Sequence, residues 1–236
     1  MTTKPNRFIS KILSPAVRLF LRSQIEKAEK LEFTIDAGNR DIFAGIIPLV
    51  HLSAHKAVYQ GLHLTDVNLT AKDISINLKE VIKGKPLKLL NPILLSGQVF
   101  LEQSDIKTSL SSSLLSNALI DLLEIIIPDI SNNAELSVKD NKIIWEQIDL
   151  TDGEFKLGGN YTDLSGNKSA IMLRASLELI ASNQLKLTLL DLQLPPNFPG
   201  AKTNIFDLDL GTEVNIKEMN INSEQISAQV DLKVLP

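Results

Sequence analysis

Residues 171–179, Ile-Met-Leu-Arg-Ala-Ser-Leu-Glu-Leu, decide the fold, because apolar side chains occupy every second position from Ile171 to Leu179. Successive side chains of a β-strand point to opposite faces, so this alternation predicts a half-buried strand with one dry face. Residues 225–234 repeat the pattern, again with polar side chains on the other face. The apolar side chains of this second run are Ile226, Ala228, Val230, Leu232 and Val234. Strands with one dry and one wet face are typical of antiparallel sheets.

Turn sequences divide the second half of the chain into short alternating runs. They are Asp140-Asn141, Asp152-Gly153, Ser165-Gly166-Asn167 and Ser182-Asn183. Turns of this composition between alternating runs are typical of consecutive β-hairpins. We therefore predict an antiparallel meander over residues 128–236.

The first half of the chain also alternates, and it contains one long helical region. Strands are predicted over residues 31–37, 50–55, 67–78 and 93–102, with a bulge at Lys72-Asp73 where the phase changes.

The helical region begins near Ser104 and ends at Pro128, and the serine run at 111–113 divides it. Apolar side chains cover so wide an arc of its longer piece that this piece must be buried on most sides. We therefore predict an α+β fold, in which a long curved antiparallel sheet wraps around one or two helices.

Composition favours a folded domain with an aliphatic interior. Of the 236 residues, 44% are hydrophobic but only 5% are aromatic, so mainly Leu, Ile, Val and Ala line the dry face. Residues 1–30 carry a charge of +5, which leaves −9 for the rest of a chain whose total is −4. An acidic body disfavours nucleic acid as a partner, because phosphate neutralisation supplies non-specific affinity. The absence of cysteine excludes disulfides and thiolate metal sites.

Residues 1–30 form a basic amphipathic segment, separate from the domain over residues 31–236. In a helix of about 100° per residue, five basic side chains gather opposite an apolar stripe. They are Lys4, Arg7, Lys11, Arg18 and Arg22. Ser14-Pro15 predicts a helix start, and the helix is expected to continue to about Lys30. We expect the five basic side chains to contact the headgroups of an anionic membrane surface.

The same segment is the basis for predicting the cellular compartment of the protein. Lys11 and Arg18 interrupt its apolar run and no small-residue cleavage site follows, so no cleavable signal peptide is predicted. We expect a cytoplasmic, peripherally membrane-associated protein, with the envelope or periplasm as the alternative.

Catalytic, cofactor and metal motifs do not occur in recognisable form. G-x-S-x-G, phosphate-binding glycine loops and zinc-ligand spacings are missing. His51 and His55 alternate with apolar residues, which predicts a solvated strand face and no metal. Four lysines surround Gly84-Pro86, either as a lipid-headgroup contact or as a solvated loop. They are Lys79, Lys83, Lys85 and Lys88.

Several short runs, taken in order, point to a known family. They are Leu13-Ser-Pro-Ala-Val17, Leu21-Arg-Ser-Gln24, Gly38-Asn-Arg40, Ile42-Phe-Ala-Gly45, Ala57-Val-Tyr-Gln-Gly-Leu62, Gly84-Lys-Pro-Leu-Lys-Leu-Leu90, Ser104-Asp-Ile106 and Leu110-Ser-Ser-Ser-Leu-Leu115. In these runs the stretch from Leu13 to Leu123 resembles the LmeA-like phospholipid-binding family. The resemblance implies a TULIP-like architecture, with a curved sheet around an apolar groove, and non-enzymatic binding of phospholipid without a cofactor.

The expected groove is lined by the apolar helix and the alternating strands. The candidate lining residues are Leu114, Leu115, Ala118, Leu119, Leu122, Ile126, Leu173, Leu177, Val230 and Leu232. Flexible aliphatic walls suit acyl chains, so the first hypothesis is binding, and possible transfer, of phospholipid or another acyl lipid. The alternative is a structural or protein-interaction module in which the same residues form a fully packed core. The sequence leaves the oligomeric state open.

Overall fold

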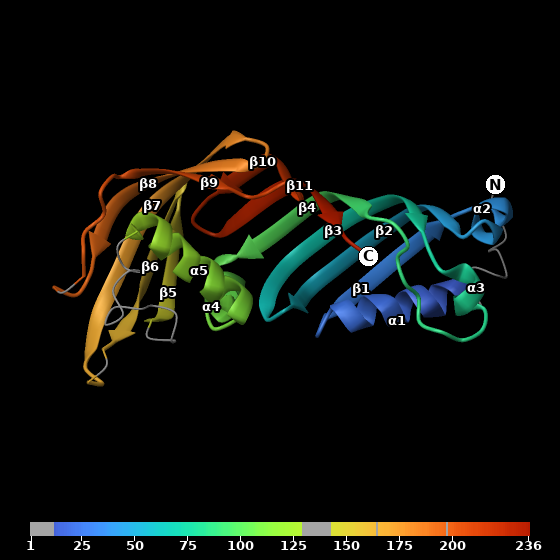
Figure 1. The fold of residues 1–236 in the computed structure, drawn as a ribbon, viewed down its shortest axis with the longest axis horizontal. Helices are drawn as coiled ribbons and strands as arrows, with labels where there is room; N and C mark the ends of the chain where they lie inside the picture. Colours follow the sequence, from blue (N-terminus) through green and yellow to red (C-terminus); the bar gives the residue numbers. More distant parts are fainter. Residues whose placement is uncertain (1–11, 129–142, 164, 197) are drawn as a thin grey trace.

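The computed structural model describes residues 12–128, 143–163, 165–196 and 198–236. Its strands form two antiparallel sheets that lie end to end along an elongated molecule (Figure 1). The predicted antiparallel α+β fold is confirmed. The curved sheet is divided into a six-stranded and a five-stranded part, so helices pack separately against each.

The six-stranded sheet contains strands from both the first and the last part of the chain. Its strand order is β1-β2-β3-β4-β11-β10. The bounds are β1 (Lys30–Asp36), β2 (Ile46–Tyr59), β3 (Leu62–Ser75), β4 (Ile93–Glu102), β10 (Val214–Ile221) and β11 (Gln225–Val234). The C-terminal hairpin therefore pairs with β4, far from it in sequence.

The five-stranded sheet is a meander with its strands in sequence order. The strands are β5 (Ile143–Thr151), β6 (Glu154–Thr162), β7 (Lys168–Ala181), β8 (Gln184–Gln193) and β9 (Ile205–Asp209). The β10 edge of the six-stranded sheet meets the five-stranded sheet at two backbone hydrogen bonds. The amide of Ile216 donates to the carbonyl of Ser182 at 2.5 Å, and that of Gly153 donates to Ile221 at 3.0 Å.

Five helices accompany the sheets in the described part of the chain. They are α1 (Ser14–Gln24), α2 (Asn39–Phe43), α3 (Leu78–Val81), α4 (Gln103–Ser109) and α5 (Ser113–Ile126). The predicted break at the serine run is confirmed, and the Ser112 hydroxyl accepts a hydrogen bond from the amide of Leu115 at 3.2 Å. No single helix in the described residues has the length and hydropathy of a membrane span; α4 and α5 reach them only together, across an 87° bend.

Helix α1 is shorter than predicted and starts differently. Leu13 precedes Ser14 in helical conformation, so Ser14 does not cap the helix, although Pro15 lies in the first turn as expected. The helix ends at Gln24 rather than near Lys30, because the next residues pair with β2. The amide of Glu26 donates to Val58 at 2.9 Å, and the amide of Val58 donates to Lys27 at 2.7 Å.

Each sheet buries its own apolar face. Helix α5 packs on the five-stranded sheet, where Leu123, Ile126 and Leu173 are almost fully buried. Helix α1 packs on the six-stranded sheet through Leu13 and Val17. At the predicted bulge Asp73 has a φ of 51°, but the β2–β3 register is the same on both sides of it, with Ile47 opposite Ile74 and Leu49 opposite Lys72. No extra residue is inserted, so the phase change comes from a local irregularity of the backbone and not from a bulge in the register.

Candidate lipid-binding surface

The six-stranded sheet has one continuous apolar face. Residues paired across antiparallel strands project to the same face, so the register can be read as rows of side chains. The three rows are Leu31-Ala54-Val67-Val99-Ala228-Met219, Phe33-Leu52-Leu69-Gly97-Val230-Ile216 and Ile35-Val50-Ala71-Leu95-Leu232-Val214. No row contains a charged or hydrogen-bonding side chain. This face resembles the lining of an acyl-chain site in its chemistry.

Both ends of this face are covered, and its middle is less so. Helix α1 covers the β1–β3 end through the cluster around Leu13 and Val17. Strands β7 to β9 of the five-stranded sheet cover the β10–β11 end through the cluster around Leu185. Between them lies the central strip, a set of half-buried side chains on β2, β4 and β11. The central strip comprises Leu52, Leu95, Val99, Ala228 and Leu232.

The candidate lining residues of the sequence analysis fall into two neighbouring clusters. One contains Leu115, Leu119, Leu122, Ile126, Leu173 and Leu177, between α5 and the five-stranded sheet. The other contains Val230 and Leu232, and it shares Leu177 with the first. Leu114 and Ala118 lie on the exposed side of α5 instead. Helix α5 is thus largely a core helix, and the partly open aliphatic surface is on the six-stranded sheet.

Sequence reasoning missed Leu95 and Val99 of the central strip for an identifiable reason. The run Ile93–Glu102 carries large apolar side chains on both faces, including Leu94 and Phe100. Alternation therefore did not show which of its side chains face the helices. The clean alternation of its partner β11 was the available signal.

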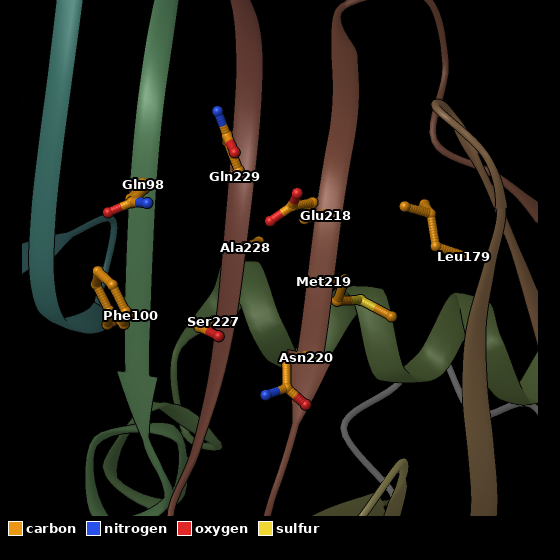
Figure 2. A pocket seen from close by; sticks show the side chains of 9 residues that line it. All are labelled: Gln98, Phe100, Leu179, Glu218, Met219, Asn220, Ser227, Ala228 and Gln229. Atoms are coloured by element: carbon orange, nitrogen blue, oxygen red, sulfur yellow. The ribbon is translucent and has the colours of Figure 1, made fainter.

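The measurable hollows of the surface open mainly on the polar face of the sheet, although Ala228 of the central strip lines one of them and Leu52 lines another. Figure 2 shows an open hollow of about 450 Å³ beside β10, lined mainly by side chains of the opposite, polar face of the sheet, among them Gln98, Glu218 and Gln229. Its apolar lining comes from Phe100, Leu179, Met219 and Ala228. Such a polar lining does not suit an acyl chain, so this hollow is not the candidate site.

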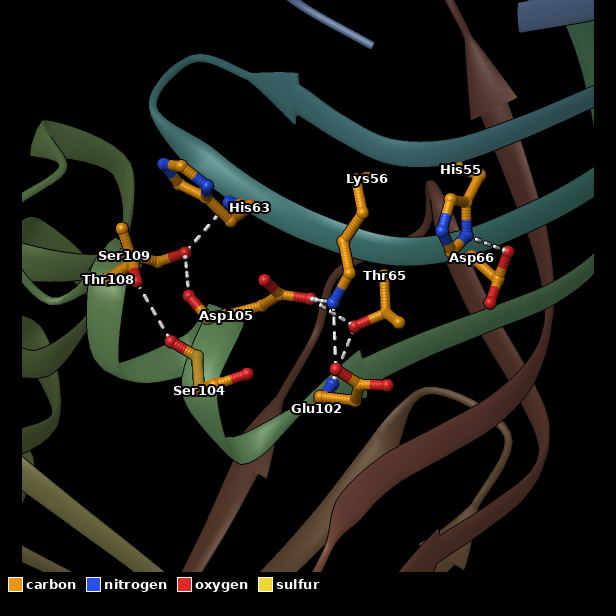
Figure 3. Close-up of polar contacts among 10 residues, drawn as sticks. All are labelled: His55, Lys56, His63, Thr65, Asp66, Glu102, Ser104, Asp105, Thr108 and Ser109. Carbon is orange, nitrogen blue, oxygen red and sulfur yellow. Dashed lines mark hydrogen bonds and ion pairs between the residues drawn. The ribbon is translucent and has the colours of Figure 1, made fainter. Parts of the chain in front are cut away.

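A polar junction joins the tip of the β2–β3 hairpin to α4 (Figure 3). The Lys56 ammonium lies 2.7 Å from the carboxylate of Glu102 and 2.9 Å from that of Asp105. The hydroxyl of Thr65 donates to Asp105 and accepts from the amide of Glu102. These contacts join the β2–β3 hairpin to the end of β4 and to the first turn of α4.

The junction shifts the ionisation of both charged partners. Hydrogen bonds to Glu102 and Asp105 raise the pKa of Lys56. Burial opposes ionisation of Asp105, but hydrogen bonds from Thr65 and Lys56 outweigh it and hold the pKa of this carboxyl below its ordinary value. Both shifts favour the charged pair at neutral pH.

Replacing Asp105 by asparagine is expected to destabilise the fold by about 1–3 kcal/mol, because it leaves the Lys56 charge with one partner. A carboxyl with a lowered pKa stabilises above its unfolded pKa of about 3.9 and loses this contribution as pH falls through the folded value. Denaturant unfolding measured from pH 7 to pH 3 should therefore show that the free energy of unfolding falls less steeply toward acid pH in Asp105→Asn than in the unaltered chain. Glu32→Gln, which breaks the exposed Lys30–Glu32 pair, serves as the control and should change stability by less than about 1 kcal/mol. Equal effects of the two substitutions would contradict a structural role of the junction.

His51 and His55 lie on the polar face of the same sheet. His55 Nδ1 lies 2.8 Å from Asp66, and His51 Nδ1 lies 3.0 Å from the Thr70 hydroxyl. Within the described ranges, no three His, Asp or Glu side chains are grouped closely enough to hold a metal ion.

Two of the five basic residues expected to contact lipid headgroups lie in the described part of the chain. Arg18 and Arg22 are exposed on α1, and the Arg18 guanidinium lies 5.7 Å from the centre of the Phe33 ring. Lys4, Arg7 and Lys11 lie outside the described residues. The apolar side of α1 packs on the sheet.

Comparison with known proteins identifies the family. No curated protein and no solved structure matches the chain significantly. The family model for LmeA-like phospholipid-binding proteins matches residues 5–231, which includes all five helices described above and every strand except the last three residues of β11. That description names the binding of a phospholipid and not a reaction. The chain therefore belongs to the LmeA-like phospholipid-binding family.

Proposed function

We propose that the protein binds phospholipid, or another acyl lipid, by laying acyl chains along the central strip of the six-stranded sheet. The observation that carries this proposal is the apolar face itself, whose rows cross all six strands without a polar side chain. In its middle the side chains of the central strip are half-buried, whereas Val67, Leu69 and Val230 between them expose 9% or less of their surface. The family match supports phospholipid as the ligand class.

The size of the face also supports the proposal. Strands lie about 4.8 Å apart, so six of them span about 24 Å. One acyl chain spans half of a hydrocarbon core about 30 Å thick, which is about 15 Å. Because both ends of the face are covered, the part that counts is the central strip from β2 to β11, which spans three strand spacings, or about 14 Å. That is close to the length of one acyl chain laid across the strands. Each methylene removed from water contributes about 0.8 kcal/mol, so no covalent chemistry is required.

Basic side chains on α1 are suited to contact the headgroup of the lipid proposed to bind here. Arg18 and Arg22 are exposed on the helix that covers one end of the apolar face. A phosphate near them would gain a charge-assisted hydrogen bond. We also propose that Lys4, Arg7 and Lys11 associate the protein peripherally with an anionic membrane surface, from which lipid is collected or to which it is delivered.

The test is a polar substitution within the central strip. Val99→Thr keeps a β-branched side chain and Leu232→Thr, combined with it, introduces one, so both positions carry a residue favoured in strands while two hydroxyls are added to the surface. About 2 kcal/mol of lipid contact is lost, so uptake of a fluorescent phospholipid should weaken about 30-fold. Native mass spectrometry of the purified protein should show a matching loss of bound phospholipid.

The matched control substitutes leucines that do not face the strip. Leu94 is 54% exposed and projects to the polar face of β4, and Leu235 is 53% exposed beyond the end of β11. Leu94→Thr combined with Leu235→Thr should leave lipid uptake unchanged. Thermal melts of both double variants report folding separately. Full lipid uptake by a folded Val99→Thr, Leu232→Thr variant would refute the central strip as the site.

A structural or protein-interaction role is the second candidate. The tight packing of α5 favours it, because Leu119, Ile126 and Leu173 expose 9%, 0% and 1% of their surface. A protein of this kind would be recovered without lipid and would not take up fluorescent phospholipid. That result, for the unaltered chain, would favour the packed module over lipid binding.

A further inference from the structure

An exposed cluster of lysines surrounds exposed apolar side chains at one end of the molecule. We call residues 79–90, which complete α3 and the turn after it, the lysine turn. The exposed lysines are Lys79, Lys83, Lys85 and Lys88. Among them, Ile82 exposes 51% of its surface and Leu90 exposes 56%. Figure 1 places α3 at the end of the molecule farthest from the five-stranded sheet.

The fold holds this turn in one shape. The Asn77 side chain accepts from the amide of Lys88 at 2.7 Å and donates to the carbonyl of Pro86 at 3.0 Å. Val81 and Leu87 are buried beneath it, in the cluster that contains Leu13. Ile82 and Leu90 are therefore presented outward by a braced element. Little ordering entropy remains to be lost when such a surface binds a partner.

Charge complementarity indicates the partner. The lysine turn has a net charge of +3, whereas the remainder of the chain carries −7. Lysine is depleted in the cores of protein–protein interfaces, so a lysine cluster with few apolar side chains is a poor match for a protein partner. Basic residues around a few large apolar side chains are instead typical of surfaces that enter the boundary between headgroups and acyl chains.

The start of the described chain lies at the same place. Ile12 and Leu13 pack in one cluster with Leu78, Val81 and Leu87, so α1 begins beside the lysine turn. The sequence immediately before Ile12 carries Lys4, Arg7 and Lys11. Helix α1, whose exposed face carries Arg18 and Arg22, therefore begins beside the lysine turn.

We propose that the lysine turn docks the protein on an anionic bilayer, with its lysines among the headgroups and Ile82 inserted at the interface. The sheet would then stand with its α3 end on the membrane and its five-stranded end away from it. This docking surface is separate from the central strip and does not depend on lipid binding there.

Vesicle flotation tests this docking. The full chain should float with vesicles of phosphatidylcholine and phosphatidylglycerol and stay unbound with phosphatidylcholine alone. Lys83→Glu combined with Lys88→Glu leaves the Lys85–Glu80 pair in place and should weaken partitioning at least 10-fold. Ile82→Ser should weaken it several-fold, and high salt should suppress it throughout.

The control reverses two exposed lysines away from the turn, Lys107 on α4 and Lys168 at the start of β7. Lys107→Glu combined with Lys168→Glu makes the same change in net charge and should leave partitioning nearly unchanged. Equal losses in both double variants, or unchanged binding of Lys83→Glu, Lys88→Glu, would overturn the proposal. Binding of the turn to an acidic protein but not to vesicles would do so as well. Phospholipid bound per purified molecule is measured in parallel, because it reports on the central strip alone.

Discussion

Replacing Gly97 by alanine is expected to destabilise the six-stranded sheet strongly, because it forces β3 and β4 apart. Gly97 lies in the middle row of the apolar face, between Leu69 on β3 and Val230 on β11. A Cβ placed there would overlap the carbonyl oxygen of Asn68 and come within 2.9 Å of the Leu69 Cα. These are backbone atoms of a central strand, so relief requires β3 and β4 to separate. Glycine inside a strand marks this kind of close backbone approach.

The expected cost of Gly97→Ala is about 3 kcal/mol, at the upper end of what overpacking causes. A natural domain has a total stability of about 5–15 kcal/mol, so Gly97→Ala should remove a large share of it and lower the denaturation midpoint clearly. Denaturant unfolding followed by circular dichroism measures the loss. Gly200→Ala is the matched control, because a Cβ there would meet open space. Wild-type stability of Gly97→Ala would show that β3 and β4 are not so closely apposed.

Local signals were enough to predict the elements whose ends carry turn or cap residues. The strand predicted over residues 93–102 coincides with β4, because Pro92 precedes it and a helix start follows at once. The division of the helical region at the serine run was likewise readable, since Ser112 caps α5 with its own hydroxyl. Both features depend on neighbours in sequence.

Features that depend on distant partners were not predictable in the same way. No local sequence feature predicts that the β10–β11 hairpin pairs with β4, because any alternating strand could pair with any other. The junction joins Lys56 to Asp105 across 49 residues. Helix α1 ends early although Glu26 and Lys27 are good helix formers, because backbone hydrogen bonds to β2 outweigh helix propensity. Tertiary contacts decided each of these cases.

Both local sequence patterns and strand pairing between distant segments were needed to identify the residues of the central strip. Alternation in β11 identified Val230 and Leu232 as apolar-face residues, and the structure pairs Leu232 with Leu95. Only this pairing shows that the ambiguous run of β4 turns Leu95 and Val99, rather than Leu94, toward the helices. A one-residue slip would exchange the two faces of β4, so the site depends on the register that Gly97 permits.

Deleting residues 1–22 is expected to lower thermal stability strongly, because it removes most of a docked helix. Leu13 and Val17 are 0% and 7% exposed, and burying each contributes about 1.5–3 kcal/mol. The deletion also uncovers the β1–β3 end of the apolar face. The melting temperature should fall by about 10 °C or more for a domain of this size, and binding of a hydrophobic dye should rise. A melt equal to that of the full chain would show that α1 is not part of the fold.

Deleting only residues 1–11 separates anchoring from packing. This shorter deletion keeps Leu13, Val17 and the whole of α1, so the melting temperature should stay within a few degrees. It removes Lys4, Arg7 and Lys11, each of which contributes about 1 kcal/mol near an anionic surface. Vesicle binding should therefore fall about 100-fold if all three lie at the membrane together with the lysine turn. A deletion that leaves both vesicle binding and stability unchanged would assign docking to the lysine turn alone, whereas a loss of stability would mean that the first eleven residues belong to the packed fold.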